Sequence, residues 1–106
     1  MIFELRMYHI QPGQRDAYVM WFEEEVIASQ VAKGVVIVGS FVGLQDEDQF
    51  VWIRRFDSEE ARERFNQEYY ESEHWKNTLE PRVQEFMVWE KMQVIELRPT
   101  PMSVIH

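Results

Sequence analysis

The sequence has no cysteine among its 106 residues, and this absence excludes disulfide bonds, thiolate metal sites and cysteine nucleophiles. Glycine is also scarce, with 4 residues, and none of them forms a glycine-rich phosphate-binding loop. A serine nucleophile elbow and a Walker motif are absent too. The sequence therefore gives no support to nucleotide binding or to serine or cysteine hydrolase chemistry.

Positive charge is in short supply, because 11 Lys+Arg stand against 19 Asp+Glu and the formal net charge is -8. Nucleic-acid binding needs a concentrated positive surface, so we expect no nucleic-acid partner. The longest apolar run, residues 35–44, is interrupted by Gly39 and Ser40 and is too short to span a bilayer. The N-terminus enters a strand pattern at once, without the basic and apolar regions of a signal peptide. We therefore expect a cytoplasmic protein without a membrane span.

Apolar residues are present in sufficient number to build one core. A chain of this length is expected to form a single domain over residues 1–106. Aromatic residues make up 14% of the chain and fall in its periodic segments. We therefore expect them to form the core or the walls of a pocket.

The first third of the chain reads as a strand followed by a helix. Residues 1–10 alternate in the manner of a strand. A break at Pro12 and Gly13 ends this pattern, and a helical period begins at Gln14. Lys33 and Gly34 mark the end of the helix, since glycine favours the left-handed cap. In the strand, one face carries Phe3, Leu5, Met7 and His9, and the other carries Ile2, Glu4, Arg6 and Tyr8.

The middle of the chain reads as a hairpin and a second helix. Residues 35–43 carry β-branched side chains on both faces, which predicts a strand with little solvent contact. Residues 44–48 connect it to a strand over residues 49–57. Asp57 or Ser58 is expected to cap the next helix. Its inward face is expected to carry Ala61, Phe65 and Tyr69 or, after a slight rotation, Arg62 and Asn66.

The last third is expected to contain a short helix and a long strand. Ser72 is a candidate cap for a helix that contains Trp75 and Leu79, and Pro81 is expected to kink or end it. Residues 85–97 alternate in the manner of a final strand. Prolines in the following residues favour an extended tail.

This order of elements, β-α-β-β-α-β, predicts an α+β, ferredoxin-like fold. Its four-stranded antiparallel sheet would carry both helices on one face, with the first and third strands at the centre. The other face of the sheet would remain apolar and uncovered. We therefore expect a homodimer in which two such sheets face each other across a two-fold axis.

Several stretches of the sequence resemble the NIPSNAP family, within the dimeric α/β-barrel superfamily. They are FELRMYHIQPGQ at the start, RRFDSEEARE after the third strand, Trp75, and ELRPTPMS near the end. The resemblance covers essentially the whole chain. It implies a ferredoxin-like dimer with a pocket between each sheet and its helices. Relatives in the superfamily include cofactor-independent monooxygenases, haem-handling enzymes and small-molecule isomerases.

The strongest candidate site residues are Glu4, Arg6 and Tyr8, which share one strand face and match the opening motif of the family. Trp52 and Arg54 on the neighbouring strand could join them. In one interpretation the arginines bind a carboxylate or enolate oxygen, and Tyr8 donates a proton or orients the ligand. In the other, the same charges form a cross-strand ladder that fixes the register of the sheet.

Other candidates are weaker. His74 and Trp75 fall in an irregular segment, where pocket residues often lie. A haem enzyme would need an axial histidine, and His74 is the one candidate. Glu71 and His74 form a single Glu-x-x-His motif, whereas carboxylate-bridged metal sites use two. His9 is expected to pack at the dimer interface. We therefore expect no metal and no cofactor.

Two functions remain open at this point. The first is a pocket for a small aromatic or carboxylated metabolite, with Arg6, Tyr8 and Arg54 as polar contacts, in a binder or in a cofactor-independent monooxygenase-like or isomerase-like enzyme. The second is a non-catalytic interaction or sensing module that acts through the surface of the dimer.

Overall fold

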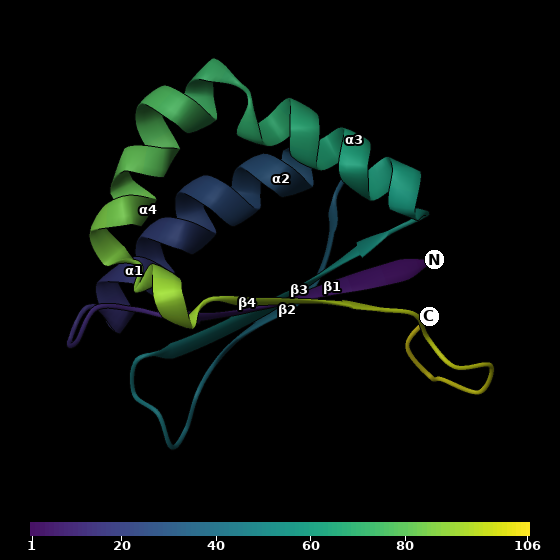
Figure 1. Cartoon of the computed structure of the whole chain (residues 1–106), viewed down its shortest axis with the longest axis horizontal. Helices are drawn as coiled ribbons and strands as arrows, with labels where there is room; N and C mark the ends of the chain where they lie inside the picture. The colour runs from purple at the N-terminus through teal and green to yellow at the C-terminus, as the bar shows by residue number, and fades with distance from the viewer.

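The computed structural model describes all 106 residues and arranges them in two layers, a sheet and a layer of helices (Figure 1). The sheet has four antiparallel strands in the order β2-β3-β1-β4. The expected ferredoxin-like order, with the first and third strands at the centre, is confirmed. The strands are β1 (Ile2–His9), β2 (Val36–Val42), β3 (Gln49–Phe56) and β4 (Gln93–Leu97).

The first helical segment is continuous over α1 (Arg15–Trp21), η1 (Phe22–Ile27) and α2 (Ala28–Ala32), and η1 is π-helical. Its buried residues recur every four positions: Tyr18, Phe22, Val26 and Gln30. In an α-helix a four-residue repeat rotates by about 40° at each step, so this stripe would drift away from the sheet. The wider π-helical turns reduce that drift and keep the stripe on the sheet.

Glycines bound this segment at the predicted places. Gly13, in the turn before α1, has φ of 78°, and Gly34, after α2, has φ of 93°. These positive values suit glycine because it has no Cβ.

The second helical segment bends sharply between α3 (Glu59–Tyr70) and the pair formed by η2 (Trp75–Leu79) and α4 (Glu80–Phe86) (Figure 1). Two serines mark its starting points, as the sequence predicts. Ser58 Oγ accepts from the Ala61 N–H at 3.1 Å, and Ser72 Oγ accepts from the Trp75 N–H at 3.2 Å. No helix in the protein combines the length and the apolar character needed to cross a bilayer.

The predicted strand over residues 85–97 is wrong in its first half. Helix α4 continues to Phe86, and after the short turn η3 (Trp89–Lys91) only residues 93–97 form a strand. Pro81 does not end the helix, because it lies at one of the first positions of α4, directly after the π-helical turns of η2. Val83 and Phe86 are buried on the inner side of that helix.

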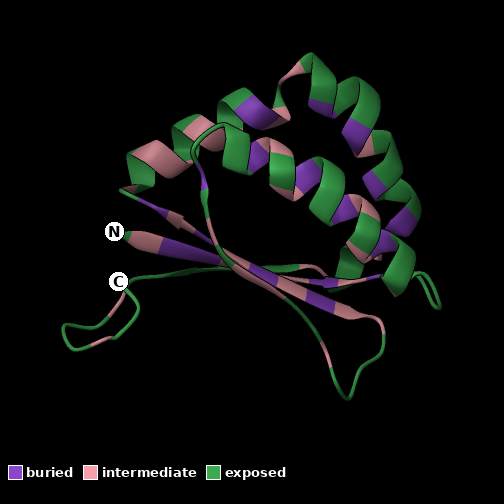
Figure 2. Ribbon diagram, turned by 180° about the vertical axis from the view of Figure 1, so that it is seen from behind, coloured by how far each residue is buried: buried purple, intermediate pink, exposed green.

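The core lies between the sheet and the two helical segments, where Figure 2 shows the buried residues facing each other. It is a cluster of 13 buried residues, and aromatic side chains form more than half of it. The expectation that the aromatic residues build the core is therefore confirmed.

No helix covers the outer face of the sheet in the single chain, and only the C-terminal tail approaches it, beside Phe3, which is 6% exposed. Strand β2 was expected to have little solvent contact, but Val36 is 47% exposed and Phe41 is 53% exposed. That expectation is wrong for the isolated chain, because β2 is an edge strand and both helical segments lie on the opposite face.

Candidate functional site

A buried cluster of charged side chains lies between β1 and β3, with Glu4 at its centre. The register places Glu4 opposite Arg54, and neither side chain is exposed to solvent. Arg54 Nη2 donates to Glu4 Oε1 at 2.5 Å, and Arg62 Nε, from α3, donates to Glu4 Oε2 at 2.5 Å. Arg6, two residues along β1, donates through Nε to Glu4 Oε1. Three arginines thus share one carboxylate, and we call these four residues the Glu4 cluster.

Arg54 has its donors committed within the protein. Nη1 donates to Gln30 Oε1 and Nη2 donates to Asn66 Oδ1, both at 3.0 Å. The guanidinium carbon also lies 5.0 Å from the ring centroid of Trp52 and 5.1 Å from that of Phe56. Four of its five N–H groups thus donate within the protein, and this buried charge joins the sheet to its helices.

Burial and charge oppose one another in the Glu4 cluster. Burial raises the pKa of the Glu4 carboxyl, but Arg54 and Arg6 more than offset this effect and lower the pKa to about 2. Burial lowers the pKa of the Arg6 guanidinium, whereas its neighbours, Tyr8 first among them, raise it above its ordinary value. Both groups are therefore charged at neutral pH.

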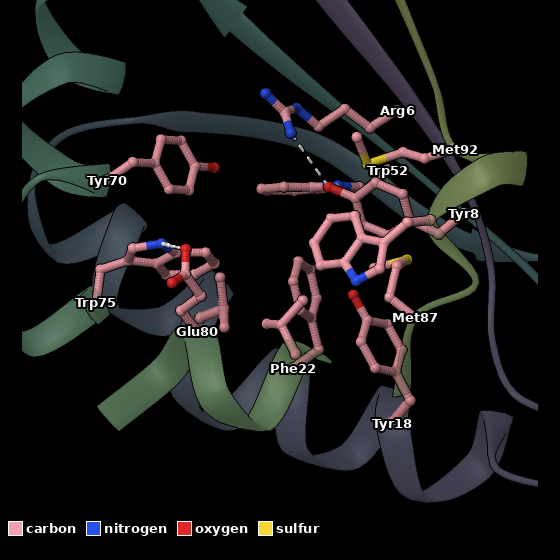
Figure 3. A pocket seen from close by; sticks show the side chains of 13 residues that line it. Arg6, Tyr8, Tyr18, Phe22, Trp52, Tyr70, Trp75, Glu80, Met87 and Met92 are labelled. Carbon is pink, nitrogen blue, oxygen red and sulfur yellow. Dashed lines mark hydrogen bonds between the residues drawn. The ribbon is translucent and has the colours of Figure 1, made fainter. Parts of the chain in front are cut away.

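A cavity of about 250 Å³ lies beside the Glu4 cluster, between the sheet and both helical segments (Figure 3). Of its 13 lining residues, 11 are hydrophobic. They come from β1, β3, every helix of the two helical segments except α2, and the stretch between α4 and β4. The lining residues are Arg6, Tyr8, Tyr18, Phe22, Val26, Trp52, Tyr70, Trp75, Glu80, Val83, Met87, Trp89 and Met92.

Aromatic rings form much of the cavity wall. Phe22 and Trp52 meet edge to face with ring centroids 4.9 Å apart, and Tyr18 stacks on Phe22 at 5.1 Å. Tyr70 and Trp75 also meet edge to face, at 4.8 Å. The π-helical segments supply Phe22 and Trp75, and such turns are frequent at functional sites. This wall suits a flat apolar ligand.

The hydroxyl group of Tyr8 lies in the cavity wall, and its O–H has no acceptor within the protein. Its oxygen accepts from Trp52 Nε1 at 3.0 Å and from Arg6 Nη1 at 3.4 Å, and no group of the protein accepts the hydroxyl proton. Burial raises the pKa of the Tyr8 phenol, so the hydroxyl keeps its proton at neutral pH. A ligand oxygen in the cavity is thus offered a polarised O–H donor.

Tyr18 adds a second hydroxyl without a partner. Its side chain is 0% exposed, and its oxygen makes no hydrogen bond in the protein. Burial raises the pKa of this phenol well above its ordinary value. Buried polar groups in native proteins nearly always have a partner, so this one points to an acceptor that the chain itself does not supply.

Glu80 and Tyr70 lie on the helical side of the cavity. Trp75 Nε1 donates to Glu80 Oε2 at 3.3 Å, and Gln30 Nε2 donates to the Tyr70 oxygen at 3.4 Å. Figure 3 shows the Glu80 carboxylate across the cavity from Arg6. The cavity thus has donors on the sheet side and one carboxylate on the helical side.

The structure divides the predicted site residues into three groups. Arg6, Tyr8, Trp52 and Trp75 come together in the cavity wall. Glu4 and Arg54 lie behind Arg6 in the Glu4 cluster and do not line the cavity. His74 is exposed on the helical segment and lies outside the cavity wall.

The remaining histidine of interest, His9, is on the outer face of the sheet. Its Nε2 lies 2.8 Å from Asp46 Oδ2, in the β2–β3 connection, and its Nδ1 is buried without a partner. Its packing at a dimer interface stays a prediction.

Sequence reasoning missed several cavity residues. Tyr18 was placed on the helical stripe but not in a site. Its hydroxyl was the signal available in the sequence, because a buried hydroxyl needs a hydrogen-bond partner that a phenylalanine would not need. Glu80 was missed because the sequence places the kink or end of a short helix at Pro81. Met87 and Trp89 were missed because residues 85–97 were predicted as a strand.

Comparisons with known proteins agree on the family and the fold. The NIPSNAP family model matches residues 3–104. No curated protein matches the chain. A NIPSNAP family protein from Agrobacterium tumefaciens is 26% identical, with a TM-score of 0.86 over 99% of this chain and 98% of that one. A second, of unknown function and from the same organism, is 23% identical, with a TM-score of 0.87 over 100% and 94%.

A solved structure outside these NIPSNAP proteins is also similar. An antibiotic biosynthesis monooxygenase is 19% identical, with a TM-score of 0.71 over 95% of this chain and 100% of that one. At this identity the likeness concerns the fold alone, and a shared fold does not imply a shared reaction.

Proposed function

Because the chain belongs to the NIPSNAP family, whose solved members share its fold over nearly its whole length, we propose that its function lies in the cavity of this fold. The cavity binds a small aromatic or carboxylated metabolite. One observation carries this proposal: two buried tyrosine hydroxyls, on Tyr8 and Tyr18, offer protons that no group of the protein accepts.

The charge of the ligand follows from Arg6. Its Nε is bound to Glu4, which fixes the guanidinium, and its Nη1 donates to Tyr8. Nη2 makes no hydrogen bond within the chain and remains free for a ligand. An anionic oxygen, from a carboxylate or an enolate, would satisfy Arg6 and Tyr8 together through charge-assisted bonds.

The shape and size of the ligand follow from the walls. An apolar protein cavity of about 150 Å³ holds a benzene molecule. The present cavity, about 250 Å³, leaves room for one aromatic ring and a carboxylate-bearing arm. The ring would lie against Phe22, Trp52 and Trp75.

A titration with phenylacetate and phenylpyruvate tests the proposal. Three of the four tryptophans, Trp52, Trp75 and Trp89, line the cavity, so their fluorescence should respond to binding. Arg6→Met removes the anion contact and should weaken binding at least about tenfold, since a charge-assisted hydrogen bond contributes about 1.5–3 kcal/mol. Arg82→Met, in an exposed arginine of α4, is the matched control and should bind normally. Equal affinities in the wild type and Arg6→Met would contradict the proposal.

Any reaction in this cavity would rely on the side chains of the protein, as in cofactor-independent monooxygenase-like or isomerase-like chemistry. A largely apolar pocket with a preorganised oxyanion site suits both, because each develops negative charge on a substrate oxygen.

A second copy of the chain is the partner that the outer face of the sheet fits. Its exposed apolar side chains extend over both edge strands, on Val36, Val38 and Phe41 of β2 and on Ile95 and Leu97 of β4. Soluble monomers rarely expose so continuous an apolar surface. Two such faces, related by a two-fold axis, would cover each other and form a homodimer. The same surface is the physical basis of the alternative function, a non-catalytic interaction module.

A further inference from the structure

Glu80 is the one carboxylate in the wall of the cavity, and nothing in the binding proposal uses it. It is the first residue of α4 and is half-buried. Trp75 Nε1 donates to its Oε2 at 3.3 Å, which orients the carboxylate. Its Oε1 makes no hydrogen bond in the chain. One oxygen is therefore held in place while the other is free to accept a proton.

The groups opposite Glu80 are all donors. Arg6 and Tyr8 come from β1 on the sheet side, and Figure 3 shows them across the cavity from the Glu80 carboxylate. A bound carbonyl compound would thus lie between a proton acceptor on one side and two oxyanion donors on the other. This arrangement is what the removal of a proton from a carbon next to a carbonyl group requires.

We propose that Glu80 is the catalytic base of a keto–enol isomerisation, and that the substrate is a planar aromatic keto acid with an acidic C–H bond next to its carbonyl group. This inference rests on the proposed ligand site of Arg6 and Tyr8 and names the substrate class and the reaction of that site.

The proton and electron balance of the step closes within the cavity. Glu80 Oε1 takes the proton from the carbon, and the electrons of the broken C–H bond form a carbon–carbon double bond. The carbonyl electrons move to the oxygen, which becomes an enolate held by Tyr8 O–H and Arg6 Nη2. The protonated Glu80 then returns its proton to the enolate oxygen or carbon. No oxidant, reductant or co-reactant is needed.

The other titratable groups of the cavity do not fit the role of base. Burial raises the pKa of the Tyr8 and Tyr18 phenols, so both keep their protons and act as donors. The Arg6 guanidinium is held charged by its neighbours. The oxygen of Tyr70, the third phenol of the wall, already accepts from Gln30 Nε2, and the wall contains no histidine and no lysine. Glu80 is therefore the group that can accept a proton from a bound carbon acid.

Deuterium exchange of phenylpyruvate tests this inference. The wild-type protein in D₂O should accelerate the loss of the methylene proton signal, followed by ¹H NMR, above the rate in buffer alone. Glu80→Gln keeps an oxygen that can accept from Trp75 but cannot take a proton. We expect it to slow the exchange at least about 100-fold, the size of a general-base contribution, while phenylpyruvate affinity changes less than about threefold. Glu85→Gln, in an exposed residue of the same helix, should exchange at the wild-type rate.

Glu80→Asp is a second test of the same role in case Glu80→Gln does not fold. It keeps the base but withdraws it by one methylene, and an intermediate exchange rate is expected. Phenylpyruvate that binds the wild type without accelerated exchange overturns the isomerisation and leaves the ligand site standing. Exchange that survives in Glu80→Gln overturns the role of Glu80. Absence of phenylpyruvate binding to the wild type overturns the ligand site and this inference together.

Discussion

At the scale of single residues, two arginines of neighbouring strands have different tasks. Arg54 is fully buried and bonded to Glu4, Gln30 and Asn66, whereas Arg6 shares Glu4 and turns the rest of its guanidinium toward the cavity. The sequence offered a ligand site and a structural ladder as alternatives for these residues. The structure supports the ladder for Arg54 and makes Arg6 the residue that links the ladder to the cavity.

Stability measurements should separate the two arginines. Arg54→Met leaves Gln30, Asn66 and part of Glu4 without a buried partner, so we expect a loss of about 3–5 kcal/mol in the free energy of unfolding. Arg6→Met leaves Glu4 with two arginines and should cost less, about 1.5–3 kcal/mol, the contribution of a hydrogen bond to a charged group. Urea unfolding at one fixed protein concentration measures both values. Equal stability of the Arg54→Met and Arg6→Met variants would contradict the structural role of Arg54.

Glu4 should make the protein sensitive to acid. Its pKa is about 2 in the folded chain, against an ordinary value of 4.5. A lowered folded pKa stabilises the protein above the ordinary value, and this contribution is lost as the pH falls from about 5 to about 2. The difference corresponds to about 3 kcal/mol.

Unfolding free energies measured from pH 7 to pH 2.5 check this expectation. The wild type should lose stability steeply below pH 5, and Glu4→Gln should show a shallower slope. Glu85→Gln, at an exposed position, should retain the wild-type slope. Parallel curves for the wild type and Glu4→Gln would rule out this source of acid sensitivity.

At the scale of the elements, caps and periodicity explain what the sequence could predict. The period-two alternation of β1 put Arg6 and Tyr8 on one face, and the structure places both in the cavity wall. Gly34 and Ser58 mark helix boundaries in the sequence and in the structure. These signals are local, so a single sequence contains them.

The missed features depend on contacts between distant parts of the chain. Pro81 reads as a helix breaker unless it is known to lie at the start of α4. Residues 87–91 alternate like a strand, but Met87 is buried beside Ile10, with which it forms an isolated bridge. Glu80 reaches the cavity because the helix continues through α4, and Trp89 reaches it because the chain turns after Met87. No local sequence pattern specifies this course of the chain.

The cap of α3 offers a test at this scale. Ser58→Ala removes the oxygen that accepts the Ala61 N–H, and the helix carries Arg62 of the Glu4 cluster. We expect a loss of about 1 kcal/mol in the free energy of unfolding, typical for an N-cap. Ser103→Ala, in the exposed tail, is the control and should change the stability little. Equal stability of Ser58→Ala and the wild type would exclude the cap as a stabilising contact.

At the scale of the whole molecule, the uncovered face of the sheet is the feature that needs a partner. The sequence predicted both this face and the homodimer, because two helices can cover only one side of four strands. The structure shows the exposed face, and the dimer and its cytoplasmic location stay predictions.

Light scattering tests the homodimer. The wild type should have twice the 12.9 kDa mass of one chain. Phe41→Glu places a charge at the centre of the exposed part of β2, where the side chain is 53% exposed, and should shift the mass toward one chain. Leu44→Glu, at a fully exposed position in the β2–β3 connection, should leave the dimer intact. A wild-type mass of 12.9 kDa would contradict the homodimer.

We propose that the cavity between the sheet and the helices is a ligand site built on Arg6 and Tyr8. A crystal structure of the protein grown with phenylpyruvate is the decisive test of this site. We expect the ring to lie against Trp52 and Trp75, and an oxygen of the ligand to lie within hydrogen-bond distance of Arg6 Nη2 and the Tyr8 hydroxyl. A cavity filled by the side chains of the protein, with Arg6 paired to Glu4 and Tyr8 alone, would contradict it.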